Sequence, residues 1–208
     1  MGGGVTIDRD DGIRAALLPR LASMVPLEPD CVLIEELGIE HGSSRIDVAA
    51  IGSLVYGFEI KAALDSLTRL QRQVQHYDRL VDFAYLVLAE KHLAAGAAGV
   101  PAHWGLIVAE ARAAEVAFRV ERPATRNLNR VPECLARLLW REEALATLSS
   151  LGLDKGIRRK PARTLHSKLA EALDLEVLSS LVLERIRRRD NWGERYKRPL
   201  RLSAVKLA

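Results

Sequence analysis

Asp47, Glu59 and Lys61 are residues of the types and spacing that phosphoryl chemistry uses. The segment 54–61 is rich in β-branched and aromatic residues, which predicts a strand. The two-residue period of a strand places Glu59 and Lys61 on one face. We therefore expect a carboxylate and an ammonium group side by side.

The preceding strand, which begins at Arg45, supplies the second carboxylate. Strict alternation groups Arg45 with Asp47 and turns Ile46 and Val48 to the other face. If the two strands form a hairpin, Asp47 lies near Glu59 across it. Two carboxylates and a lysine are thus expected to meet at one place.

Two carboxylates held close together repel each other, and a divalent cation removes that repulsion. Mg²⁺ accepts one or two carboxylates together with waters and substrate oxygens, and Mn²⁺ is the expected substitute. Lys61 would orient the attacking water and offset the charge that develops on the phosphorus centre. The alternative for Glu59 and Lys61 is an ordinary surface ion pair, which contributes little energy.

These residues resemble a known family. Asp47, followed after eleven residues by Glu59-Ile60-Lys61, is similar to the D…(D/E)-x-K signature of the PD-(D/E)XK nucleases. Glu36 stands where many members have a further acidic residue, and Ile46 replaces the proline of the signature. The resemblance implies that Asp47, Glu59, Glu36 and the backbone carbonyl of Ile60 hold the metal, and that Asp47, Glu59 and Lys61 are catalytic.

A second motif follows in the predicted helix. Gln73 and Tyr77 resemble the Q-x-x-x-Y element of the RecB-like branch, and a spacing of four places both on one helical face. The same stretch resembles small stand-alone bacterial members of unknown function. The resemblance implies that Gln73 and Tyr77 contact the substrate strand, although Tyr77 also continues the apolar stripe of its helix, which is an equally good reason for its presence.

Two arginines are further candidates for substrate binding. Arg69 and Arg45 carry guanidinium groups whose geometry matches phosphate oxygens, and Arg69 ranks first. Surface arginines often have no such role, so both are hypotheses.

The remaining pattern predicts an α/β fold with a restriction-endonuclease-like core, in which a central mixed sheet is flanked by helices. An amphipathic helix is expected over 12–24, three strands between 32 and 61, and a helix capped by Asp65 or Ser66 that continues to about Val81. Strands follow at 83–88 and 105–108, with a small-residue loop or short helix between them, and the composition of segment 94–100 favours the loop. After Pro123 the pattern indicates helices over 132–148, 161–173 and 176–189, with no further strand.

The charge distribution divides the chain. Residues 1–125 are expected to form the nuclease-like core and residues 126–208 a helical C-terminal portion. From Lys155 onward there are 15 Lys and Arg against 6 Asp and Glu, although the whole chain has a net charge of only +4. Arg158 to Lys160 and Arg185 to Arg189, near Trp192 and Tyr196, either bind a polyanion backbone or form a solvated basic helix end.

The cysteines, the histidines and the lengths of the apolar runs narrow the possible kinds of metal site and the cellular location. Cys31 and Cys134 stand apart in apolar segments, which predicts two buried thiols. The histidines lack metal-ligand spacing, so any metal is expected to have oxygen ligands. No apolar run is long enough to cross a membrane, and the N-terminal residues lack the features of a secretory signal. A cytoplasmic protein is expected.

The sequence thus favours a metal-dependent nuclease acting on nucleic acid, with DNA as the preferred substrate. Two alternatives stay open: a non-catalytic nucleic-acid-binding or regulatory module on the same fold, and an interaction subunit of a defence or mobile-element system. A homodimer would supply the second site that a double-strand cut requires, but the residues do not decide the number of copies.

Overall fold

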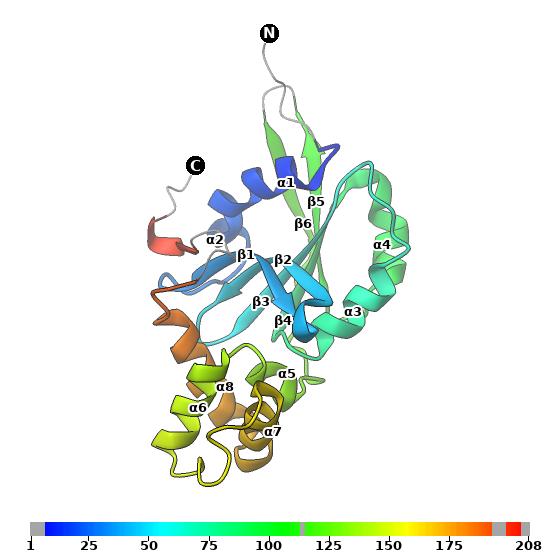
Figure 1. Ribbon diagram of the computed structural model, residues 1–208. Helices are drawn as coiled ribbons and strands as arrows, with labels where there is room; N and C mark the ends of the chain where they lie inside the picture. Colours follow the sequence, from blue (N-terminus) through cyan, green and yellow to red (C-terminus); the bar gives the residue numbers. More distant parts are fainter. Residues whose placement is uncertain (1–6, 113–114, 193–198, 205–208) are drawn as a thin grey trace.

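The computed structural model describes residues 7–112, 115–192 and 199–204. Within these residues the chain forms one seven-stranded mixed sheet with helices against both faces, so the α/β prediction is confirmed (Figure 1). The strands are β1 (Val32–Ile39), β2 (Ser44–Ile51), β3 (Val55–Lys61), β4 (Phe83–Ala89), β5 (Gly105–Ala111), β6 (Val116–Arg122) and β7 (Leu200–Arg201).

The strand order is β6-β5-β4-β3-β2-β1-β7. The first three strands form the predicted antiparallel meander. Strands β3, β4 and β5 run parallel, and each parallel step is made through a helical connection. Both ends of the sheet are antiparallel, with β6 beside β5 and β7 beside β1.

Helices cover the two faces of this sheet. They are α1 (Asp10–Leu17), α2 (Leu21–Met24), α3 (Leu70–Asp78), α4 (Leu93–Gly99), α5 (Pro132–Ala136), α6 (Arg141–Ser150), α7 (Ala162–Ala172) and α8 (Leu175–Arg187). Side chains of α3 and α5 to α8 join a first core cluster, and those of α1 and α2 join a second. None of the described helices is long and apolar enough to cross a membrane.

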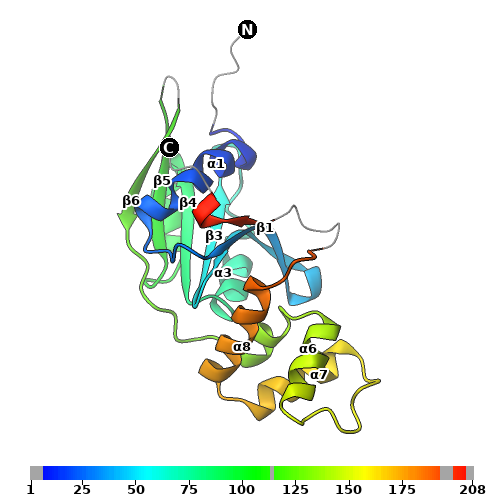
Figure 2. The ribbon, with the colours of Figure 1, turned by 90° about the vertical axis from the view of Figure 1, so that its left-hand side faces the viewer.

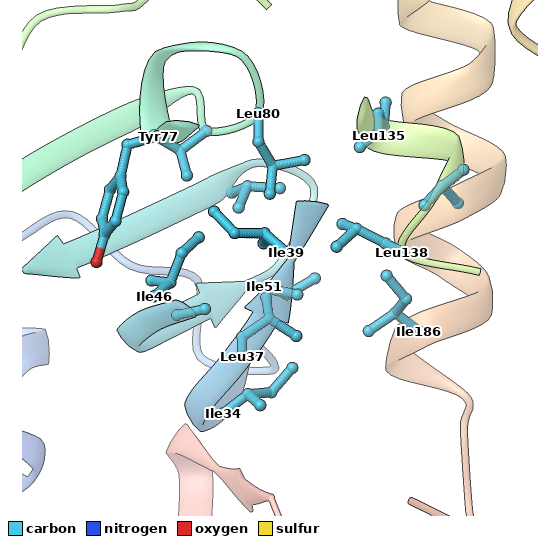
Figure 3. Packing of buried hydrophobic residues seen from close by; sticks show 14 of the residues in the cluster. Ile34, Leu37, Ile39, Ile46, Ile51, Tyr77, Leu80, Leu135, Leu138 and Ile186 are labelled. Carbon is cyan, nitrogen blue, oxygen red and sulfur yellow. The ribbon is translucent and has the colours of Figure 1, made fainter. Parts of the chain in front are cut away.

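Strand residues alternate between the two clusters, as a sheet with two covered faces requires. In β4, Leu86 belongs to the first cluster, whereas Tyr85 and Val87 belong to the second. The first cluster is shared by the strands and the C-terminal helices, which gather at the lower end of Figure 1. Figure 3 shows Leu135, Leu138 and Ile186 facing Ile39 and neighbouring residues of the sheet.

The helix that carries Gln73 and Tyr77 is shorter than expected. It begins at Leu70 with Arg69 as its N-cap and ends at Asp78, so the prediction that Asp65 or Ser66 caps it is wrong. The Asp65 carboxylate instead accepts a 2.7 Å hydrogen bond from the backbone N–H of Ala62. It thereby closes the turn that follows β3.

Two helical segments also differ from the prediction. Residues 94–100 were expected to form a loop, but α4 occupies Leu93–Gly99, because alanine has a high helix propensity and Gly96 packs closely on Leu86 and Leu88. The single helix expected over 132–148 is two helices, α5 and α6, separated at 137–140.

Two strands were missed. Strand β6 is largely exposed, so it carries little apolar signal. Strand β7 is two residues long, and it corrects the expectation that no strand follows Pro123. Figure 2 shows this C-terminal strand beside β1.

Candidate active site

A cavity of about 490 Å³ opens where β2 and β3 cease to pair, next to the start of α3. It contains every site residue predicted from the sequence except Tyr77, which lies beneath it. The cavity is lined by Asp10, Glu36, Gly42, Ser43, Ser44, Arg45, Asp47, Glu59, Ile60, Lys61, Asp65, Ser66, Arg69, Arg72 and Gln73.

Asp47 lies just past the last paired residues of β2 and β3, Val48 and Phe58. There its side chain replaces the backbone as hydrogen-bond partner: Oδ2 accepts the N–H of Ile60 at 2.8 Å. This bond fixes the carboxylate against β3. Among the described residues no hydrogen bond engages the other carboxylate oxygen of Asp47, Oδ1.

Glu59 is fully buried and receives three hydrogen bonds. Lys61 Nζ donates to Oε1 at 2.6 Å, the amide Nε2 of Gln73 donates to the same oxygen, and the Tyr77 hydroxyl donates to Oε2 at 2.8 Å. The predicted pairing of Glu59 with Lys61 on one strand face is confirmed. Gln73 and Tyr77 point to the same place because they are one helical turn apart on α3.

Glu36 has an unusual backbone. Its φ is +54°, in the left-handed region that residues other than glycine rarely adopt. Ile34 and Leu37 are three positions apart, yet both join the same core cluster, which strict alternation forbids. The turn of the backbone at Glu36 therefore reverses which face of β1 is apolar.

The same reversal occurs in β2, where Asp47 occupies the register position across from Glu36. Ile46 belongs to one core cluster and Val48 to the other. The prediction that Ile46 and Val48 share a face is therefore wrong. The physical reason is the irregular backbone at this pair of positions, which cannot be deduced from an alternation pattern.

The Glu36 carboxylate is held by two arginines. Arg14 of α1 approaches it at 2.5 Å and Arg45 at 3.0 Å. Arg14 is itself 8% exposed and also pairs with Asp10 at 2.8 Å. Glu36, which was expected to help hold the metal, lines the cavity, and its partners in the structure are two guanidinium groups.

Sequence reasoning missed Arg14, Asp10 and Arg72 as residues at the site. Arg14 lies one residue after the buried Ile13 of α1, and only the fold brings it to Glu36. Its one local signal is the spacing of four from Asp10, which suits a helical ion pair. Arg69, a candidate for substrate binding from the sequence, lines the cavity together with Arg72.

Burial governs the electrostatics of the site. Burial, and then the nearby charge of Glu59, raises the pKa of Asp47 from 3.8 to about 7, although the Ile60 N–H and Lys61 oppose the shift. Burial and the same carboxylate raise the pKa of Tyr77 well above 10. The pair Asp47 and Glu59 therefore carries negative charge that the protein groups only partly compensate.

The donor set fits a hard divalent cation. A carboxylate has about four acceptor positions; hydrogen bonds occupy one on Asp47 and three on Glu59. The buried Oε1 of Gln73 has no hydrogen-bond partner among the described residues. In those residues no three His, Cys, Asp or Glu side chains gather to hold a metal alone, and Mg²⁺ does not require them.

A comparison with protein families gives one match, to the family described as Bacteriophage P4 protein cII, over residues 5–202. The chain belongs to the bacteriophage P4 cII protein family. No curated protein and no solved structure matched the chain. The P4 cII match extends across both the sheet and the C-terminal helices.

A second cavity, of about 920 Å³, adjoins the first in this member of the P4 cII family. The two cavities share Glu36, Gly42 and Arg45 as lining residues. It lies between β1 and the C-terminal helices. Its remaining lining residues are Leu37, Gly38, Ile39, Glu40, Cys134, Arg137, Leu138, Leu139, Trp140, Arg141, Ala162, Arg189 and Trp192.

The basic residues of the C-terminal portion lie in different environments. Arg158, Arg159 and Lys160 are exposed. Arg187 and Arg188 pair with Asp30 and Glu184 on the surface, and Arg158 likewise pairs with Asp154 at 2.6 Å. Arg189 is inserted between two tryptophans. Tyr196, which was expected near these residues, lies outside the described residues.

Proposed function

We propose that this protein is a Mg²⁺-dependent nuclease that hydrolyses phosphodiester bonds, with an active site and core of the PD-(D/E)XK type. The observation that supports this most directly is the meeting of Asp47, Glu59, Lys61 and Gln73 at one cavity. An ordinary surface ion pair does not explain this arrangement, because Glu59 is completely buried and Lys61 is 4% exposed.

Asp47, Glu59 and the backbone carbonyl of Ile60 are the groups that would hold the cation. When bound, the cation would polarise the phosphate and make a water molecule more acidic. Glu36 lines the same cavity but is neutralised by Arg14 and Arg45. We assign it the role of keeping these guanidinium groups at the rim, where phosphate oxygens would enter.

Lys61 has the role of positioning the attacking water and stabilising negative charge on the phosphorane-like centre. Its ammonium group is fixed by a 2.6 Å bond to Glu59. Gln73 and Tyr77 in turn fix the other side of the Glu59 carboxylate. These bonds hold the reacting groups in place before the substrate arrives, which lowers the reorganisation needed in the transition state.

Arg69 and Arg72 are the proposed phosphate contacts, since both line the cavity and lie beside the start of α3. DNA is the substrate we propose, and it is compared directly with RNA in the experiment. Labelled single- and double-stranded DNA and RNA would be incubated with the protein in Mg²⁺, Mn²⁺ or EDTA.

The decisive variants are Asp47→Asn, which keeps an oxygen for the Ile60 N–H, and Lys61→Met, which keeps the apolar stem. Each has a matched control at an exposed position, Asp30→Asn and Lys91→Met. We expect metal-dependent cleavage that falls on the order of 100-fold or more in the two site variants and is unchanged in the controls.

Circular dichroism and thermal melting would establish that each variant is folded. Cleavage that survives Asp47→Asn and Lys61→Met would place the activity elsewhere. Folded protein that binds nucleic acid without cleaving any of the four substrates would indicate the non-catalytic module instead.

A further inference from the structure

The second cavity contains an aromatic ring in a fixed orientation. The guanidinium carbon of Arg189 lies 4.3 Å from the ring centre of Trp140 and 4.7 Å from that of Trp192. Nε of Arg189 also donates to Glu143 at 2.8 Å, which orients the guanidinium plane. The three side chains form a stack that joins the end of α8 to the start of α6.

Trp140 keeps an open surface in this stack. It remains 37% exposed, whereas Trp192 is 8% exposed and Trp104 is fully buried. Trp140 also lines the second cavity. A rigid, partly exposed tryptophan at the wall of a groove is the feature on which unpaired bases stack, since every base has a π-face.

The charge at the groove suits a polyanion. Its two carboxylates are already neutralised, Glu36 by Arg14 and Arg45, and Glu40 by Arg137 at 2.8 Å and Arg79 at 3.3 Å. These ion pairs leave the groove without uncompensated negative charge that would repel phosphates.

An exposed basic segment borders the same groove. Arg141, which lines it, donates a 2.7 Å hydrogen bond to the backbone carbonyl of Arg158. Arg158 is followed by the exposed Arg159 and Lys160. Ala162, just beyond them, lines the groove again.

We propose that the second cavity binds a single-stranded segment of the nucleic acid, with one base stacked on Trp140 and the backbone phosphates beside Arg141 and residues 158–160. The inference rests on the proposed function, because the shared residues Glu36, Gly42 and Arg45 make this groove continuous with the candidate active site. Single strands are specified because the faces of bases in a duplex are covered by their neighbours.

Binding would be measured in EDTA, so that turnover plays no part. The probe is a fluorescein-labelled oligothymidylate, with a duplex of equal length beside it, and the readouts are anisotropy and quenching of tryptophan fluorescence. Trp140→Ala is expected to weaken single-strand binding roughly 5- to 100-fold and to abolish most of the quenching. Trp140→Phe should retain binding within about 3-fold, since its ring still stacks.

Leu151→Ala is the matched control, because Leu151 is 40% exposed and flanks the opposite end of α6. It should bind as the unmodified protein does. Charge reversal at Arg159 and Lys160 should reduce the slope of log affinity against log salt by about 0.7 for each lost contact. Lys91→Glu, at an exposed site outside both cavities, should leave the slope unchanged.

Each result separates this inference from the nuclease assignment. Equal single-strand affinity of folded Trp140→Ala and unmodified protein would overturn the stacking site even if the protein cleaves nucleic acid. Trp140-dependent binding without any cleavage would support the groove and reject the nuclease. Absence of oligonucleotide binding would overturn the inference and point to a protein occupant.

Discussion

The hydroxyl group of Tyr77 donates a 2.8 Å hydrogen bond to Glu59 Oε2. The hydroxyl oxygen of Tyr77 also accepts a hydrogen bond from the backbone N–H of Asp47 at 3.3 Å. One phenol of α3 thus connects β2 and β3 beneath the candidate site, where the two strands have stopped pairing with each other.

Tyr77→Phe removes this connection while keeping the ring. We expect the free energy of unfolding to fall by about 1–3 kcal/mol, because a buried carboxylate oxygen and a backbone N–H lose a partner. Cleavage should fall as well. Urea denaturation checks the prediction, with Tyr56→Phe as the control, since the Tyr56 hydroxyl makes only a 3.4 Å contact with Pro26. Equal losses in the two variants would contradict the assigned role.

Asp47→Asn should change how stability depends on pH. The folded pKa of about 7 lies above the ordinary value of 3.8, so the unfolded chain releases its proton first as pH rises. The metal-free protein therefore loses stability between about pH 4 and pH 7. The variant should be more stable than the unmodified protein at pH 8, by at most about 4 kcal/mol, and nearly equal at pH 4.

The measurement is urea denaturation in EDTA across this pH range, with Asp30→Asn as an exposed control. Adding Mg²⁺ should remove most of the advantage of Asp47→Asn at pH 8, because the cation stabilises the ionised carboxylate of the unmodified protein only. An advantage of Asp47→Asn over the unmodified protein that is no larger at pH 8 than at pH 4 would contradict the buried charge.

Glu36→Gly should separate stability from function. Glycine adopts a positive φ without the steric penalty of a side chain, which favours the folded state by about 1 kcal/mol. The gain is offset by the lost ion pairs and by the greater freedom of the unfolded chain. We expect thermal stability within about 1 kcal/mol of the original and a clear loss of nuclease activity. Glu36→Val, which is β-branched, should destabilise strongly.

Cys31 and Cys134 should be inert in the native protein. Burial raises the pKa of both thiols to about 11, and for Cys134 the adjacent Glu40 adds to the shift. The reactive thiolate is therefore scarce at neutral pH. Reaction with a thiol reagent at pH 7.5 should be slow in buffer and fast in denaturant. Rapid labelling of the folded protein would contradict this environment.

The sequence predicted those strands and helices in which apolar residues recur at a regular spacing. Strands β1 to β5 and helices α7 and α8 have apolar patterns that follow their burial, so their positions were close to correct. The pairing of Glu59 with Lys61 and the shared face of Gln73 and Tyr77 followed from local periods. That the two pairs belong to one site was implied by the family resemblance, not by short-range geometry.

What the sequence did not predict depends on contacts between distant segments. A glutamate with positive φ has no signature of its own, and Glu36 gives none. The approach of Arg14 to Glu36 requires α1 to cross the sheet, which no local pattern specifies. Strand β7 is too short to show alternation, and it forms because its backbone pairs with the outer edge of β1.

That last pairing has a consequence for synthesis of the protein. Val32 of β1 pairs with Arg201 of β7. The outer edge of β1 therefore acquires its partner strand only after nearly all of the described chain has left the ribosome. Until then a strand with free backbone groups is presented to solvent and to other nascent chains. Folding of this sheet is completed only once β7 has been synthesised, and until then the outer edge of β1 can pair with another strand.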